Sequence, residues 1–293
     1  MSPGLGPDGG PAIRVVGLTR SYGALRAVDD IDLTVERGQC VALLGPNGAG
    51  KTTTTEILEG YRSRDSGDVR VLGIDPSAAD RRWRTRVGIV LQQVGDLSEL
   101  TVRESLRHFA GYYPNPRPVD EVLDQVGLTS KAESRGRTLS GGQRRRLDVG
   151  LGIIGRPELL FLDEPTTGFD PEARRDFWAL IESLKAEGAT ILLTTHYLEE
   201  AEALADMVGV INRGRLVAFD APAELGGRGR GQVRVSWTEA GEQRSESTNA
   251  PTALVAQLSQ RFGGEVPHLS VTRPSLEDTY LSLVDDGDRA VRS

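Results

Sequence analysis

The sequence has little cysteine and no long apolar run. Its 293 residues include one cysteine, Cys40, so no disulfide can form within the chain and a reducing compartment is expected. Cys40 lies in an apolar strand pattern, where we expect a small buried hydrophobic side chain. No segment approaches the roughly 18 consecutive apolar residues of a membrane span, and the Gly- and Pro-rich N-terminus lacks the apolar core of a signal peptide.

Lysine is also scarce, and the charge balance is acidic. Lys and Arg together number 35 against 42 Asp and Glu, which gives a formal net charge of −7. This balance argues against nonspecific nucleic-acid binding as the main activity. The basic run Arg144-Arg145-Arg146 is interpreted as a phosphate-proximal or solvated helix face. The strong preference for Arg over Lys indicates a GC-rich bacterial genome.

A glycine-rich segment joins an apolar strand pattern to a helix pattern. Gly45, Gly50, Lys51 and Thr52 fit the spacing G-x-x-x-x-G-K-[ST], in which successive backbone N–H groups wrap phosphates at a helix N-terminus. Lys51 should reach the β- and γ-phosphates, and the Thr52 hydroxyl should bind Mg²⁺. A turn that binds nothing is disfavoured by the position of the glycines. The expected phosphate-binding residues are Gly45, Pro46, Asn47, Gly48, Ala49, Gly50, Lys51, Thr52 and Thr53.

Two carboxylates follow another apolar run. Residues 159–162 are continuously apolar, as in a central parallel strand covered on both faces, and Asp163 and Glu164 come directly after them. His196 follows another predicted buried strand, at 190–195. Ligands bind at the carboxyl ends of such strands, so these three side chains are expected at one edge of the sheet. A mere strand cap is disfavoured, because adjacent carboxylates there are costly without a cation.

Three further positions carry local signals. Ser140 and Gln143 have capping-box spacing around Gly141 and Gly142, which predicts a second anion-binding concavity at a helix start. Asp170 should cap a long helix that begins at Pro171 and ends at Gly188. Tyr22 lies near a turn, where it could stack on an adenine ring or be an ordinary core or surface residue.

The chain divides by composition into a tail, a large domain and an appendage. The composition predicts a disordered tail at residues 1–12 and the main domain at residues 13–225, with antiparallel strands near its start. An all-helical insertion is predicted at about 95–156, with helices at 101–113, 118–126 and 144–154. Residues 226–231 read as a flexible linker within a 226–293 accessory region. Strands at 232–237 and 265–273 and helices at 251–262 and 275–284 are expected there.

In this order and at these separations, the motifs resemble the complete set of an ATP-binding-cassette (ABC) ATPase over about residues 13–225. The signature Leu139-Ser140-Gly141-Gly142-Gln143 is the discriminating part. The resemblance implies an α/β P-loop NTPase fold with a mostly parallel core sheet, an antiparallel β subdomain and a helical subdomain. It also implies that Tyr22 stacks on adenine, that Gln92 is the sensor glutamine, that Asp170 belongs to the D-loop and that His196 is the switch histidine. Phe169 before Asp170 and the doubled Gln92-Gln93 depart from the family pattern.

The chemistry implied is hydrolysis of ATP with Mg²⁺. Thr52, Gln92 and Asp163 would hold the metal, and Lys51 would screen the γ-phosphate. Glu164 would orient and deprotonate the attacking water, and Gln92 and His196 would complete the shell around it.

The resemblance also implies partners. In the family two cassettes face each other head to tail, so that Ser140, Gly141, Gly142 and Gln143 of one copy cover the γ-phosphate held by the other. We therefore expect a homodimer. Residues 45–53, 139–147 and 274–278 resemble daunorubicin-resistance-type exporter ATPases, which implies a separate integral membrane permease contacted around residues 93–106. The chain would then lie on the cytoplasmic face of the cell membrane and power export of a drug, antibiotic, lipid or polymer.

Two functions other than powering an exporter are also considered. A soluble ABC ATPase acting on ribosomes or DNA is disfavoured, because such relatives carry two cassettes or a very long coiled coil between cradle and signature. No nucleic-acid partner is therefore expected. A non-hydrolysing regulatory cassette is disfavoured by the intact Lys51, Asp163, Glu164 and His196.

Overall fold

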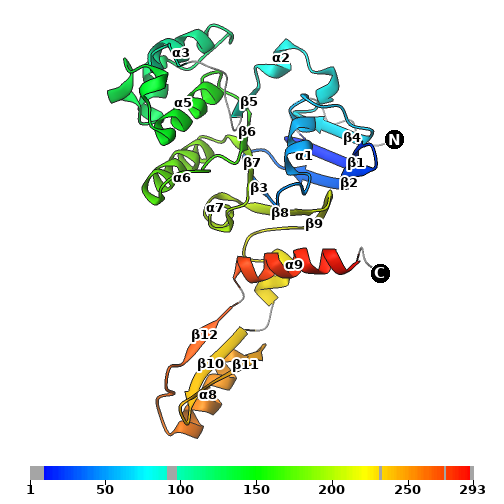
Figure 1. Cartoon of the computed structure of the whole chain (residues 1–293), viewed down its shortest axis with the longest axis vertical. Coiled ribbons are helices and arrows are strands. Elements are labelled where there is room, and N and C mark those ends of the chain that lie inside the picture. Colours follow the sequence, from blue (N-terminus) through cyan, green and yellow to red (C-terminus); the bar gives the residue numbers. More distant parts are fainter. Residues whose placement is uncertain (1–9, 91–97, 231–232, 274, 291–293) are drawn as a thin grey trace. The chain divides into compact units, whose positions relative to one another are not determined.

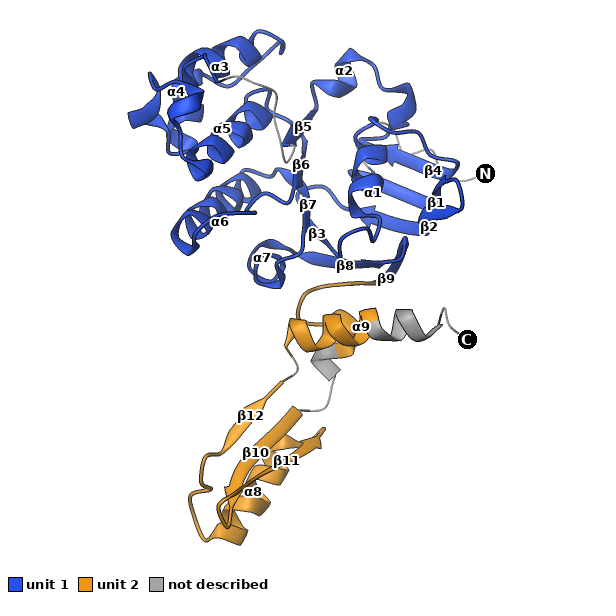
Figure 2. Ribbon diagram, in the orientation of Figure 1, with its two compact units in different colours: residues 1–217 blue, residues 218–293 orange. Residues whose placement is uncertain are grey.

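The computed structural model describes residues 10–90, 98–230, 233–273 and 275–290. Within them the chain forms two compact units, Met1–Val217 and Ala218–Ser293 (Figure 2). The division falls inside strand β9 (Arg215–Asp220), earlier than the boundary expected near residue 225.

The core of the first unit is a mostly parallel sheet with the strand order β5-β6-β7-β3-β8-β9 (Figure 1). Adjacent strands from β5 through β8 pair in parallel. Every residue of β3 and β7 is buried, as predicted for central strands covered on both faces. The register places Leu44 beside Thr195 and Asp163 beside Thr194, so the chain leaves these strands at one edge. The strand bounds are β5 (Val87–Val90), β6 (Leu159–Asp163), β7 (Thr190–Thr195), β3 (Cys40–Leu44) and β8 (Met207–Asn212).

An antiparallel sheet of order β2-β1-β4 precedes and flanks this core, from β1 (Ile13–Tyr22), β2 (Leu25–Val35) and β4 (Ser66–Val71). Ile31, Leu33 and Val35 are buried and alternate with exposed residues, which confirms the predicted half-buried strand. The predicted disordered tail is wrong at its end. Ala12 is buried, and its carbonyl accepts a hydrogen bond from the Leu72 N–H at 2.7 Å. Residues 1–9 lie outside the described part.

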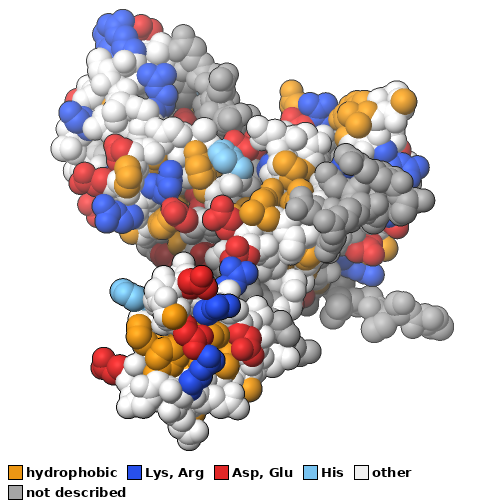
Figure 3. Space-filling model, turned by 60° about the horizontal axis from the view of Figure 1, so that its bottom comes forward, with side chains coloured by type: hydrophobic (Ala, Val, Ile, Leu, Met, Phe, Trp, Pro, Cys, Tyr) orange, Lys and Arg blue, Asp and Glu red, His pale blue; other side chains and the backbone are white. Residues whose placement is uncertain are grey.

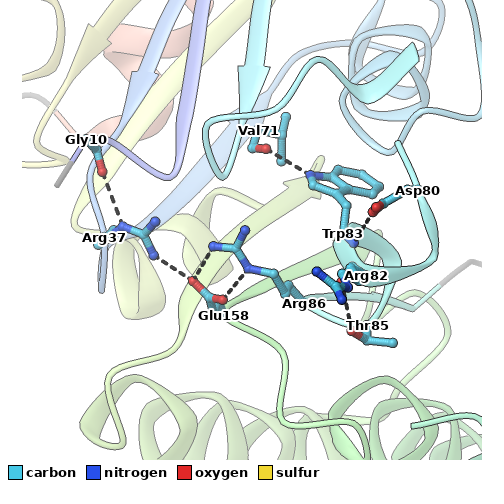
Figure 4. Close-up of polar contacts among 9 residues, drawn as sticks. All are labelled: Gly10, Arg37, Val71, Asp80, Arg82, Trp83, Thr85, Arg86 and Glu158. Carbon is cyan, nitrogen blue, oxygen red and sulfur yellow. Dashed lines mark hydrogen bonds and ion pairs between the residues drawn. The ribbon is translucent and has the colours of Figure 1, made fainter. Parts of the chain in front are cut away.

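Polar contacts join the two sheets (Figure 4). The Glu158 carboxylate, at the start of β6, accepts from Arg37 at 2.8 Å and from Arg86 at 3.0 Å. The indole N–H of Trp83 donates to the Val71 carbonyl at 2.9 Å, and Trp83 is buried. Trp83 belongs to the short helix α2 (Arg81–Arg84), which the sequence patterns did not predict. The antiparallel sheet is thereby fixed to the strands that lead to the carboxylate edge.

The helical insertion contains α3 (Val102–Ala110), α4 (Val119–Gln125) and α5 (Gly141–Ile153). The capping boxes predicted at Thr101 and Ser140 are both present with reciprocal hydrogen bonds. Helix α3 ends at Ala110 rather than at 113, and α5 begins at Gly141 rather than at 144 because Ser140 is already its N-cap. Helix α1 (Lys51–Leu58) follows β3, α6 (Pro171–Ala186) follows β6, and α7 (Leu198–Leu204), which was not predicted, follows β7.

The second unit has a small antiparallel sheet of order β11-β10-β12 and a helix, α8 (Pro251–Phe262), with the predicted bounds. Val235, Trp237 and Leu258 form its core. Strand β10 (Val233–Glu239) was predicted, whereas β11 (Glu242–Thr248) was missed because it contains no apolar residue. Strand β12 covers Ser270–Thr272 only, and α9 (Leu276–Ala290) is longer than expected.

The predicted flexible linker is also corrected. Residues Leu225–Arg230 form the short 3-10 element η4, in which Leu225 is fully buried. A Cβ on Gly226 would lie 2.7 Å from the Thr279 Cγ2, so η4 packs closely against α9. Residue 231 lies outside the described residues. No helix in the described ranges is long and apolar enough to cross a membrane.

Candidate nucleotide site

The glycine-rich turn between β3 and α1 fits tightly against its neighbours. A Cβ on Gly45 would lie 2.2 Å from the Ile211 carbonyl oxygen, and one on Gly50 would lie 2.3 Å from that of Ala27. Gly50 also has a φ of +109°, in the region that favours glycine. Gly45 and Gly50, which the motif predicts, are thus required because neighbouring backbone carbonyls leave no space for a side chain.

The turn leaves the start of α1 accessible to a ligand. In the described part of the chain, Gly50 is an N-cap without a side-chain capping bond, so the first N–H groups of α1 have no such partner. Pro46, Asn47, Gly48 and Thr52 are exposed, Thr53 is half-buried, and Ala49 is buried. The helix dipole makes this end favourable for an anion.

Lys51 is 5% exposed and turned back onto the cradle. Its Nζ donates to the Gly45 carbonyl at 2.7 Å and to the Pro46 carbonyl at 3.2 Å. Burial lowers the pKa of Lys51, while the nearby Glu164 and Asp163 carboxylates act in the opposite direction. A bound phosphate would exchange these carbonyl contacts for charge-assisted ones.

The strand ends bring Asp163, Glu164 and His196 together, as predicted. The Thr194 hydroxyl donates to the Asp163 Oδ1 at 2.5 Å, and His196 Nδ1 lies 3.4 Å from the Glu164 Oε1. Glu164 has a φ of +42°, which is unusual for a residue with a side chain. Such strained positions cluster at functional sites when neighbours hold them in place.

The residues of the signature lie at a separate place. Helices α5 and α1 lie on either side of the central strands (Figure 1). Ser140 N–H donates to the Gln143 Oε1 at 3.1 Å, and Gln143 N–H donates to the Ser140 Oγ at 3.3 Å. Gly142 is half-buried, whereas Ser140 and Gly141 are exposed, and a Cβ on Gly141 would meet nothing within 4 Å among the described atoms. The signature end of α5 therefore presents an open face.

Two other predicted positions have ordinary partners. Asp170 is the N-cap of α6, accepting from the Ala173 N–H at 2.8 Å. Tyr22 is 38% exposed at the end of β1, with its hydroxyl accepting from Arg62 at 3.2 Å. The guanidinium groups of Arg20 and Arg62 lie 4.9 Å and 5.9 Å from the Tyr22 ring centroid.

The predicted metal ligands are hard oxygen donors. Thr52 is exposed and Asp163 half-buried, and both donor types suit Mg²⁺. The described residues contain no cluster of three or more His, Cys, Asp or Glu side chains that could hold a metal. Gln92, the remaining predicted ligand, lies outside the described residues.

Arg145 is a residue whose position sequence reasoning missed. It is 7% exposed, with Nε donating to the Pro165 carbonyl at 3.0 Å and Nη2 to the Asp163 carbonyl at 2.7 Å. The prediction of a phosphate-proximal or solvated face is therefore wrong for this member of the run. Its spacing of four residues from the buried Val149 is a signal that could have placed it on the inner face of α5.

Glu59 is a second buried ionisable side chain near the site, at the end of α1. It is 8% exposed, and burial raises its pKa from 4.5 to about 8, with Asp163 and Glu56 adding to the effect. The folded chain therefore keeps a proton that the unfolded chain releases above about pH 4.5. The stability from this proton is present at low pH and lost as the pH rises towards 8.

We expect Glu59→Gln to remove that loss. Because one pKa unit corresponds to about 1.4 kcal/mol, the wild-type chain should lose up to a few kcal/mol that the variant retains. Urea unfolding between pH 5 and pH 8.5 measures the difference. Glu99→Gln, at a side chain 67% exposed, is the control and should follow the wild type. Parallel pH curves for wild type and Glu59→Gln would contradict the assignment.

Comparison with known proteins identifies the family. The family model described as ABC transporter matches residues 28–167, which hold the cradle, the signature and both carboxylates. The chain is 38% identical to the daunorubicin resistance ATP-binding protein DrrA2 of Streptomyces coeruleorubidus, over 94% of this chain and 95% of the relative. It is 44% identical to the Nod factor export ATP-binding protein I of Ralstonia nicotianae, over 76% and 71%.

The fold agrees with this match. A solved structure of an ATP-binding subunit of an ABC transporter aligns with a TM-score of 0.70 at 24% identity, covering 93% of this chain and 99% of that one. The expected P-loop NTPase architecture is thereby confirmed. The chain therefore belongs to the family of ABC transporter ATP-binding proteins and is an ATP-hydrolysing enzyme.

Proposed function

We propose that this chain powers export through a separate membrane permease by hydrolysing ATP between two copies of itself. The observation that supports this most is the meeting of Asp163, Glu164 and His196 at the strand edge beside the Lys51 cradle. Its similarity to a daunorubicin resistance protein over nearly the whole chain favours a drug or antibiotic as the cargo.

The roles follow from the chemistry of each group. Mg²⁺, when bound, would neutralise phosphate charge, and Thr52 and Asp163 would hold it together with Gln92. Lys51 would leave the Gly45 and Pro46 carbonyls to bind the β- and γ-phosphates. Glu164 would take the proton of the attacking water, and His196, 3.4 Å from its carboxylate, would help to keep that carboxylate in place.

The second copy is needed because one chain has only half of each nucleotide site. Ser140 and Gly141 are exposed at the open start of α5, away from the cradle of their own chain. A head-to-tail dimer would bring each signature onto the γ-phosphate held by the other copy. Removal of that phosphate by hydrolysis would weaken the dimer and reopen it.

The permease would dock in a hollow of about 680 Å³ between the end of α1, α2, β5 and α3. Its rim carries apolar and aromatic side chains, among them Tyr61, 79% exposed, and Ile89, 38% exposed, with Phe109 and Tyr113 further along the lining. Exposed apolar surface of this kind suits an amphipathic partner helix. The described residues that line the hollow include none of residues 98–106, which belong to the surface expected at 93–106; residues 93–97 lie outside the described part of the chain.

Affinity purification from the host tests this proposal. The tagged chain, isolated from gently solubilised membranes, should bring down a stoichiometric multi-span membrane protein, identified by mass spectrometry. Tyr61→Asp should abolish its recovery, while Val16→Asp, at an exposed valine outside the hollow, should not. Equal recovery with Tyr61→Asp would overturn the docking site.

The same experiment weighs the alternative of a soluble ABC ATPase on ribosomes or DNA. Recovery only with ribosomes or nucleic acid would favour it over the transporter. The charge distribution speaks against it. On the face in Figure 3, acidic and basic side chains are interspersed, and the whole chain carries a net charge of −7.

A further inference from the structure

Glu164 is held by its backbone from two directions. From β7, Thr194 accepts the Glu164 N–H with its carbonyl at 3.1 Å and with its hydroxyl at 3.2 Å. From α5, Arg145 donates to the carbonyls of Asp163 and Pro165, the residues on either side of Glu164. The strained residue thus lies between two carbonyls fixed by one guanidinium.

The geometry of this contact favours an arginine over a lysine at position 145. The two hydrogen bonds measure 2.7 Å and 3.0 Å, within the ordinary range, and the Arg145 side chain is buried, so solvent competes little for it. The planar fork of arginine can bind two acceptors at once, which a lysine ammonium does not reproduce. Its neighbours in the basic run contact other parts of the protein, Arg144 the Gly136 carbonyl and Arg146 the Asp176 carboxylate.

We propose that Arg145 is a positioning residue that fixes the Glu164 carboxylate for water activation by clamping the backbone on both sides of it. Without the clamp, the peptide groups that give Glu164 its φ of +42° are free to relax, and the carboxylate leaves its place beside His196. This inference rests on the proposed role of Glu164 as the base.

The clamp also connects two sites. Arg145 belongs to the same helix as Ser140, the N-cap at the open signature end. In the proposed dimer, that end contacts the nucleotide of the other copy. A shift of α5 on nucleotide binding in one site would therefore move the backbone around Glu164 in the other. In the proposed dimer, Arg145 would thereby couple the two hydrolytic events.

The test compares Arg145→Met and Arg145→Lys with Arg146→Met as the matched control on the same helix. Steady-state hydrolysis with Mg-ATP should show kcat reduced about 10- to 100-fold in both Arg145 variants, with KM changed less than about threefold. Arg146→Met should keep a near wild-type kcat. Thermal melts and binding of a fluorescent ATP analogue show that each variant is folded and loads nucleotide. If Arg145→Met fails to fold, Arg145→Lys carries the test, because it keeps the charge.

A double-mutant cycle separates positioning from a general structural role. In the Glu164→Gln background, Arg145→Lys should reduce the residual rate no further, because the residue that it positions is already gone. Independent, multiplying losses would overturn the proposal, as would an unchanged kcat in folded Arg145 variants. If Glu164→Gln itself keeps wild-type turnover, the proposed role of Glu164 fails instead, which is a distinguishable result.

Discussion

Glu164→Gln is expected to bind ATP like the wild type and to lose nearly all turnover. The amide keeps the size of the carboxylate and its backbone contacts with Thr194, but it cannot accept the proton of the attacking water. Loss of a general base reduces the rate by about 10²- to 10⁴-fold. Phosphate release under saturating Mg-ATP measures the rate, and a fluorescent ATP analogue measures the affinity.

The same variant should also accumulate as a dimer. ATP that is bound but not hydrolysed would keep both nucleotide sites closed, so light scattering should show twice the monomer mass with ATP and the monomer without it. Glu172→Gln, in the first turn of α6, is the control and should hydrolyse ATP normally. A Glu164→Gln monomer at saturating ATP and Mg²⁺ would contradict the head-to-tail arrangement, and wild-type turnover would contradict the role of the carboxylate.

Lys51→Met should bind ATP much more weakly than the wild type. Hydrogen bonds to charged groups contribute about 1.5–3 kcal/mol, so losing the ammonium should weaken ATP binding by about 10- to 150-fold. The rate of hydrolysis should fall by more than the affinity for ATP, because the ammonium also stabilises the charge on the γ-phosphate in the transition state. Isothermal titration with ATP and Mg²⁺ gives the affinity.

The matched control is Lys131→Met, which removes an exposed lysine of the helical insertion. It should bind ATP with unchanged affinity. Methionine fills much of the space of the lysine stem, and burial already disfavours the ammonium of Lys51, so Lys51→Met should remain folded in a thermal melt. Unchanged ATP affinity in folded Lys51→Met would remove this lysine from the nucleotide site.

The parts of the fold that local signals dictate were predictable. Strand β3 is apolar along its whole length, β7 has the apolar centre Ile191-Leu192-Leu193, and the capping boxes at Thr101 and Ser140 require only residues three positions apart. Strand β11 gave no such signal, because it is exposed along nearly its whole length and is held only by pairing with β10. The glycines of η4 suggested a flexible linker, whereas Gly226 packs closely against Thr279 of α9, a contact that no local pattern signals.

The residues of the candidate site also divide into those that local sequence patterns predict and those that only the tertiary fold brings together. Motif spacing placed Lys51, and the end of an apolar strand placed Asp163 and Glu164. The contact of Arg145 with the carbonyls of Asp163 and Pro165 joins residues 18 and 20 positions apart through the tertiary fold. The left-handed backbone of Glu164 was equally hidden, since glutamate is not a residue type that signals it.

The buried cysteine of β3 has a practical consequence for following the motions of this enzyme. Cys40 is fully buried, and burial raises the pKa of its thiol to about 12, so it stays protonated and out of reach of alkylating reagents in the folded chain. A thiol introduced at an exposed position becomes the sole target for a spin label or a fluorophore. The natural sequence thus serves directly as the background for distance measurements between the two copies of the proposed dimer.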